Sequence, residues 1–184
     1  MTSRLLLISP AIGPALREAR FYDGSSSIDE APAATGALPK AAHVVLSPGA
    51  RCRDTAEALG QRGVTAAELA PLDAGQWRGR TLAEVAATDG EALTRWLTDP
   101  DYAAPDGESV RDVCARVGHW LASVPDGRTI AVVEPDVLRA TVVHALALPT
   151  GTFWRLDIPP LTATELSGRS GRWNLRLGRA LGGE

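Results

Sequence analysis

Three short, mostly apolar runs recur along the chain, and each ends at a polar residue followed by proline. They are Arg4–Ile8, His43–Leu46 and Thr129–Val133. Continuous apolar runs of this length are typical of strands that are buried on both faces. Proline lacks a backbone N–H and disfavours helix in the residue before it, so each predicted strand should end at its Ser-Pro or Glu-Pro step.

Helix signals lie between and after these runs. Residues 50–59 form the first predicted helix, and Thr81–Ala87 opens with a capping box before a second helical stretch over residues 90–97. Ser109 is expected to begin a longer helix whose apolar residues recur at helical spacing. Asp136 is expected to cap the helix that follows the third strand.

The C-terminal part has a different pattern. Thr162–Ser167 and Arg172–Leu177 alternate around a glycine-bearing segment, which predicts a β-hairpin, and Phe153–Ile158 alternates in a way that favours extended chain. Residues 24–39 are rich in Ser, Ala, Pro and Gly and predict a loop. The whole pattern predicts a single α/β domain over residues 1–184, folded as a three-layer α/β/α sandwich. Exposed hairpin edges would allow a homodimer.

Ligands of open α/β sheets bind beyond the carboxyl ends of the strands. Those ends are Ser9-Pro10, Ser47-Pro48 and Glu134-Pro135. The sequence therefore predicts a pocket at this edge of the sheet.

Composition narrows the function classes. The 184 residues are 45% apolar and 22% charged with a net charge of −3, which permits a real core and excludes a disordered chain. No run approaches the roughly 20 apolar residues of a membrane span, and no signal-peptide core is evident, so a cytoplasmic protein is expected. Slight acidity argues against nucleic-acid binding. Cys52 and Cys114 are too few for a disulfide framework or a zinc site, and no cofactor or metal is expected.

Four segments, in this order along the chain, resemble the histidine phosphatase superfamily, whose fold is phosphoglycerate mutase-like. Ser47–Glu57 is similar to the family's S-P-x-x-R-A-x-Q-T-A segment, and Gly75–Thr81 is similar to its G-x-W-E-G-x-T segment. Pro105–Ser109 resembles P-G-G-E-S, and Phe153–Leu177 matches the family's tail in order and character. The resemblance covers nearly the whole chain.

The same resemblance implies that the catalytic positions have changed. The family's R-H-G, which carries the nucleophilic histidine, corresponds to Ser9 and Pro10 followed by alanine. Its second histidine, in S-H-G-G, corresponds to Pro135, and its usual acid corresponds to Pro71, with Asp73 nearby. Phosphoryl transfer through phosphohistidine needs an imidazole and an acid, so this chemistry is expected to be lost.

The three histidines of the chain offer no replacement. His43 opens a predicted strand at the end away from the pocket, whereas His119 and His144 lie within predicted helices. All three are expected to be structural residues.

Phosphate binding is also expected to be weak. Relative to the family, Ser9 removes one of two paired arginines, Glu134 adds a negative charge, and two prolines remove backbone donors. A charge pair about 4 Å apart is worth ~4 kcal/mol at an effective dielectric near 20. The net loss of affinity is on the order of a thousandfold, although Arg78 restores some positive charge.

Several pocket residues keep two interpretations. Arg51 either binds a ligand or pairs with Glu134, and Asp136 is either a helix cap or an acid. Cys52, near a helix start, is either a packed residue or a thiol of lowered pKa, and Arg78 is either a ligand contact or a solvated surface charge. The candidates for catalysis are Glu134, Asp136, Asp73 and Ser9. Those for substrate binding are Arg51, Ser9, Glu134, Arg78 and Glu108.

Two functions follow from these residues. The first is a pseudoenzyme, in which the fold is retained as a binding or regulatory module for a small molecule or a protein. The second is a repurposed enzyme, in which Glu134 and Asp136, with help from Asp73, perform acid–base chemistry on a small metabolite or hold a divalent cation. A residual phosphatase activity is a variant of the second.

Overall fold

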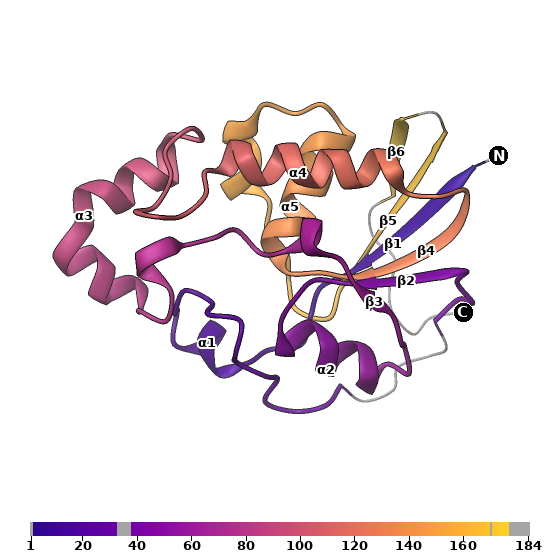
Figure 1. Ribbon diagram of the computed structural model, residues 1–184, viewed down its shortest axis with the longest axis horizontal. Coiled ribbons are helices and arrows are strands. Elements are labelled where there is room, and N and C mark those ends of the chain that lie inside the picture. Colours follow the sequence, from indigo (N-terminus) through magenta and orange to yellow (C-terminus); the bar gives the residue numbers. More distant parts are fainter. Residues whose placement is uncertain (1, 33–37, 170, 177–184) are drawn as a thin grey trace.

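The computed structural model describes residues 2–32, 38–169 and 171–176. Its centre is a six-stranded sheet in the order β3-β2-β4-β1-β5-β6 (Figure 1). The strands are β1 (Ser3–Ile8), β2 (His43–Leu46), β3 (Val64–Thr65), β4 (Gly127–Val132), β5 (Ala163–Arg169) and β6 (Arg172–Arg176). The first four are mutually parallel where they pair, whereas β5 runs antiparallel to β1 and β6.

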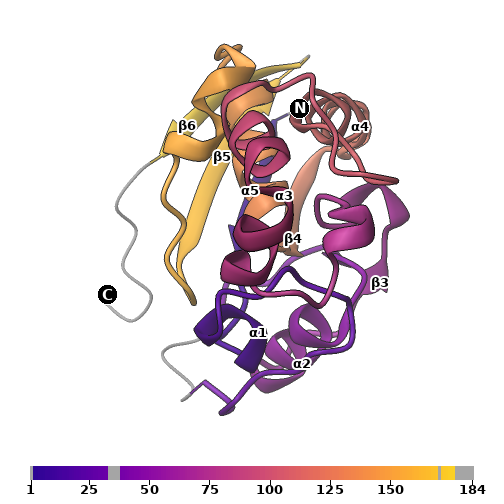
Figure 2. The same ribbon diagram turned by 90° about the vertical axis from the view of Figure 1, so that its left-hand side faces the viewer.

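Helices cover both faces of this sheet. They are α1 (Pro14–Arg17), α2 (Ala50–Ala58), α3 (Leu82–Thr98), α4 (Val110–Ser123) and α5 (Pro135–Ala145). Short 3₁₀ segments cover Ala67–Leu69, Gly75–Trp77 and Thr150–Arg155. Figures 1 and 2 show α4 and α5 on one face and α2 on the other, with α1 and α3 beyond the carboxyl-terminal edge of the parallel strands.

The residues of β1 show why the layers form. Leu5 and Leu7 join the larger core beneath α4 and α5, whereas Leu6 and Ile8 join a smaller core beneath α2, where Cys52 is fully buried. Successive side chains of a strand point to opposite faces, so an apolar run binds helices on both sides. The predicted three-layer α/β architecture is confirmed.

Local signals placed several elements correctly. The Thr81 hydroxyl accepts from the backbone N–H of Glu84 in a complete capping box, and Ser109 and Asp112 form another. The predicted break between two helical stretches is a kink within α3, at Asp89, whose φ is −131°. The strands β1, β2 and β4 end at or within one residue of the predicted positions.

The C-terminal hairpin is confirmed, since β5 and β6 pair along their length. Its predicted last residue, Leu177, lies outside the described residues, as do residues 33–37 of the predicted loop. The expected extended segment at Phe153–Ile158 is wrong: the chain there is a 3₁₀ helix as far as Arg155. Phe153 is fully buried, and its packing rather than the alternation sets the local conformation.

An aromatic cluster closes one side of the carboxyl-terminal edge. Ring centroids lie 5.7 Å apart for Phe21 and Trp77, 5.9 Å for Trp77 and Trp96, and 4.6 Å for Trp96 and Trp154. Phe153 extends the cluster, 4.8 Å from Trp154. These rings come from the loop after α1, from α3 and from two 3₁₀ segments, so their packing holds these parts of the chain together.

No helix within the described part of the chain is both long enough and apolar enough to cross a membrane.

Candidate functional site

A cavity of about 630 Å³ lies beyond the ends of β1 and β4, beside the aromatic cluster. Five prolines line it, namely Pro10, Pro71, Pro135, Pro159 and Pro160. Its other apolar and aromatic walls are Leu16, Phe21, Tyr22, Leu72, Ala74, Leu82, Trp96, Leu97, Trp154 and Ile158. Its charged residues are Arg20, Arg51, Glu134, Asp136, Arg139 and Asp157.

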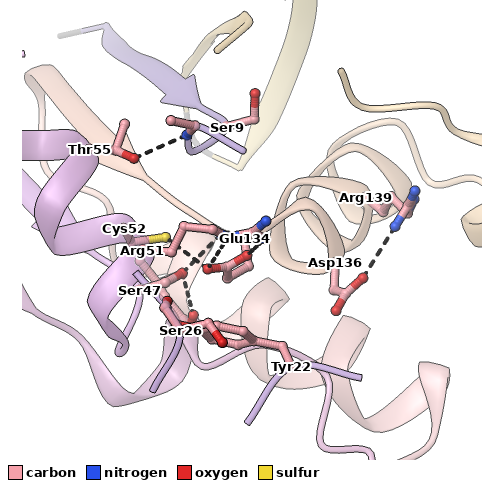
Figure 3. Close-up of polar contacts among 12 residues, drawn as sticks. Ser9, Tyr22, Ser26, Ser47, Arg51, Cys52, Thr55, Glu134, Asp136 and Arg139 are labelled. Carbon is pink, nitrogen blue, oxygen red and sulfur yellow. Dashed lines mark hydrogen bonds and ion pairs between the residues drawn. The ribbon is translucent and has the colours of Figure 1, made fainter. Parts of the chain in front are cut away.

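A buried ion pair forms part of this wall. The Arg51 guanidinium donates to both carboxylate oxygens of Glu134, through Nε to Oε1 at 3.3 Å and through Nη2 to Oε2 (Figure 3). The two side chains are only 8% and 2% exposed. Burial alone would lower the pKa of Arg51, but the hydrogen bond and charge of Glu134 outweigh it and raise that pKa. Of the two interpretations of Arg51, the pairing is therefore the one observed.

The side chain of Ser47 anchors the backbone of Glu134. Glu134 is the residue that precedes α5, and its N–H donates to Ser47 Oγ at 3.3 Å. The same hydroxyl donates to the carbonyl of Leu69 at 2.6 Å. Ser47 of the Ser-Pro step after β2 thus links the ends of two strands.

Tyr22 lies against the guanidinium. The centroid of its ring is 5.5 Å from Arg51 Cζ, and its hydroxyl donates to the Ser26 carbonyl at 3.4 Å. Burial and the nearby Glu134 charge raise the pKa of Tyr22. Gly49 makes this position possible: its φ is +125°, and a Cβ there would lie 2.6 Å from the tyrosine oxygen.

Cys52 is a packed residue, which settles the two interpretations of its thiol. Its Sγ donates to Glu134 Oε1 at 3.4 Å and is fully buried. Burial, followed by the charge of Glu134, raises the pKa of this thiol well above its ordinary value. A protonated thiol is a poor nucleophile.

Ser9 lies apart from the Arg51–Glu134 pair (Figure 3). Its hydroxyl donates to the Pro159 carbonyl at 2.6 Å and accepts from the Thr162 N–H at 3.0 Å. Ser9 is not among the described residues that line the large cavity. Ser9 therefore joins the end of β1 to the segment that leads into β5.

Asp136 lines the cavity, but the expected helix-capping role is wrong. Glu134 is the N-cap residue of α5 and Pro135 its first helical residue, so the helix begins earlier than predicted. The Asp136 carboxylate instead accepts from Arg139 Nη1 at 3.2 Å. Burial raises the pKa of Asp136, although Arg139 opposes this shift.

Asp73 and Arg78 lie at a second cavity of about 400 Å³. Arg78 donates to both oxygens of Asp73 at 2.7 and 2.6 Å, and the Gly75 N–H adds a third bond at 2.8 Å. Burial opposes the shift, but these partners lower the pKa of Asp73. Glu108 pairs with Arg116 at 2.7 and 2.8 Å and lines neither of these two cavities.

The histidines have the predicted positions. His43 opens β2, His119 lies in α4 and His144 lies in α5. In the part of the chain that the structure describes, none of them lines the large cavity. The described residues also contain no group of three or more side chains suited to a metal ion.

The family model of the histidine phosphatase superfamily (branch 1) matches residues 26–179. The chain belongs to this superfamily. A mycobacterial glucosyl-3-phosphoglycerate phosphatase, Rv2419c, solved with VO3, has a TM-score of 0.82 and 26% identity over 94% of this chain and 96% of its own. A putative alpha-ribazole-5'-P phosphatase from Escherichia coli has a TM-score of 0.85 and 18% identity over 99% of both chains. No curated protein matches the sequence.

Among the cavity residues that sequence reasoning missed, Tyr22 and Arg139 contact residues that it had singled out. Arg139 contacts Asp136 from one helical turn away, so the i,i+3 spacing was a usable signal. Tyr22 lies in an irregular segment, and nothing in its local pattern predicted its contact with Arg51.

Glu134→Ala is expected to destabilise the protein by about 3–5 kcal/mol, because it leaves a buried guanidinium without its partner. Replacing both residues, as in Arg51→Met with Glu134→Leu, should restore most of this loss. Urea unfolding measures both effects. Asp101→Ala, which breaks the exposed pair with Arg111, is the matched control and should have little effect. A loss for Glu134→Ala no larger than that of the control would contradict the structural importance of the buried pair.

Neither cysteine is expected to react with Ellman's reagent in the native protein at pH 8. Cys52 is buried and protonated, and burial raises the pKa of Cys114 to about 11. Both thiols should react once the chain is unfolded in urea. Rapid native labelling of Cys52, identified by mass spectrometry, would show that it is more accessible and acidic than its surroundings imply.

Proposed function

We propose that this superfamily member lacks phosphohistidine chemistry and acts as a binding or regulatory module for a small, largely apolar molecule. The observation that carries the proposal is the buried Arg51–Glu134 pair. Arg51 is the retained arginine of the S-P-x-x-R segment, and its guanidinium is already bonded to a carboxylate at both Nε and Nη2.

A phosphate in this cavity would have to displace Glu134 or lie beside it. Displacement leaves a carboxylate buried without its partner, and proximity adds a repulsion of ~4 kcal/mol per charge pair at about 4 Å and an effective dielectric near 20. The described wall of the cavity has no excess of positive charge that would compensate for this cost. Three arginines and three carboxylates line it, so the wall suits an uncharged ligand.

Two prolines support the proposal that phosphohistidine catalysis is lost. Pro10 and Pro135 line the cavity at the ends of β1 and β4, where the resemblance places the two catalytic histidines. Proline has neither an ionisable side chain nor a backbone N–H. These two positions therefore offer no nucleophile, no general acid and no N–H donor for an anion.

The size and character of the cavity support binding. Its volume of about 630 Å³ lies within the usual range of small-molecule sites, roughly 300–1,000 Å³. Phe21, Trp96 and Trp154 provide aromatic surface next to the proline faces. Such walls favour a flat or branched apolar body over a hydrated anion.

Asp136 favours a second candidate, the repurposed enzyme. Its carboxyl group lines the cavity, and its raised pKa suits a general acid or base acting on a small metabolite, with Glu134 nearby. A residual phosphatase would use the same group to protonate the leaving oxygen. Both variants require turnover that depends on Asp136.

The matched probes 2-naphthol and 2-naphthyl phosphate test the proposal. The wild-type protein is expected to bind 2-naphthol and to bind the phosphate at least about tenfold more weakly, as measured by calorimetry. It should not hydrolyse the phosphate above the level of Asp136→Asn. Glu134→Gln should improve binding of the phosphate relative to that of 2-naphthol, because it removes the competing charge.

Two outcomes would count against the proposal. Hydrolysis by pure wild-type protein that disappears in Asp136→Asn would establish the enzyme candidate instead. Tighter binding of the phosphate than of 2-naphthol would show that the Arg51–Glu134 pair opens readily for an anion. Circular dichroism of each variant verifies that its fold is retained.

A further inference from the structure

The second cavity adjoins the first. The two share Tyr22, Pro71, Leu72 and Ala74 in their walls. Together they enclose a larger space than either alone, and a molecule that crosses this shared wall would contact both.

Among the described residues that line both cavities, Tyr22 is the only polar one. The backbone of the preceding residue is anchored, since Phe21 N–H donates to Arg80 O and Phe21 O accepts from Gly79 N–H, both at 2.9 Å. The side chain of Tyr22 is held by its contact with Arg51 and by a long hydroxyl bond of 3.4 Å to the Ser26 carbonyl. The wall between the two cavities therefore contains the half-buried ring of Tyr22, which is carried on a fixed backbone.

The two cavities differ in chemistry. The larger one has apolar walls and balanced charges, whereas the smaller one is lined by Asp23, Asp73 and Arg78. Arg78 is bonded to Asp73 through two nitrogens, and Asp23 accepts from the N–H and hydroxyl of Ser25 at 2.9 and 2.8 Å. Two carboxylates and one guanidinium leave the described lining of the smaller cavity with a net negative charge.

Hydrogen bonding keeps these two carboxylates ionised. The Ser25 donors lower the pKa of Asp23. Burial opposes the same shift at Asp73, but Arg78 and Gly75 lower its pKa nonetheless. The negative charge is thus present at neutral pH, and a cation would be attracted to it.

We infer that the two cavities form one bipartite site for an amphipathic amine, whose apolar body fills the larger cavity and whose ammonium head lies beside Asp23 and Asp73. The inference rests on the proposed function, because the larger cavity supplies the apolar half of the site. Tyr22 is then the specificity-determining residue, since its ring separates body from head.

Three probes that differ only in the head group test this inference. They are 3-(2-naphthyl)propylammonium, 3-(2-naphthyl)propanol and 3-(2-naphthyl)propionate, each titrated calorimetrically into the wild-type protein. Affinity is expected to fall in that order, with the ammonium about tenfold tighter than the carboxylate at low salt. The difference should shrink as ionic strength rises, because the smaller cavity is open to solvent.

Variants locate the effect. Asp73→Asn should remove most of the preference for the ammonium, with a smaller effect on the affinity for the propanol. Asp101→Asn removes a carboxylate paired with Arg111, away from both cavities, and should preserve the preference. Tyr22→Phe should preserve it as well, whereas Tyr22→Ala should weaken all three probes by removing a wall of both cavities.

Each outcome separates this inference from the proposed function. Equal affinities for the three probes, or tighter binding of the carboxylate, would overturn the bipartite site while leaving apolar binding intact. Binding of 2-naphthol without binding of any longer probe would do the same. Failure of 2-naphthol and of all three longer probes to bind would overturn the proposed function itself.

Discussion

The site depends on one buried interaction, the bidentate ion pair between Arg51 and Glu134. It joins the first turn of α2 to the residue before α5, and Tyr22 and Cys52 pack against its two members. An isolated charge at this depth would be strongly unfavourable, so each partner makes the other possible. The cavity therefore presents balanced charge where a superfamily resemblance alone implies a phosphate site.

Much of the fold was predictable because its signals are local. Apolar runs cut by proline mark β1, β2 and β4, and the capping boxes at Thr81 and Ser109 mark the starts of α3 and α4. The prediction of extended chain at Phe153–Ile158 was wrong for a physical reason. Its alternation arises from one deeply buried ring and its neighbours, and aromatic packing favours a 3₁₀ helix there.

The site was less predictable because its contacts join distant parts of the chain. Arg51 and Glu134 are 83 positions apart, and the sequence left open whether they pair. Ser9 was a candidate because it ends a strand, yet its hydroxyl turns to Pro159 and Thr162, a choice that only the neighbouring strand determines. Asp136 was predicted to cap α5, but the helix begins earlier, with Glu134 as its N-cap and Pro135 at the first helical position.

The aromatic cluster gives the protein a built-in optical reporter. Trp96 and Trp154 lie in contact, with centroids 4.6 Å apart and their planes tilted by 51°, and both also line the large cavity. Indoles this close share their electronic excitation, so the near-ultraviolet spectrum responds to their mutual orientation. A molecule that enters the cavity contacts these two fluorescent side chains. Its binding can therefore be followed by intrinsic tryptophan fluorescence without any attached dye.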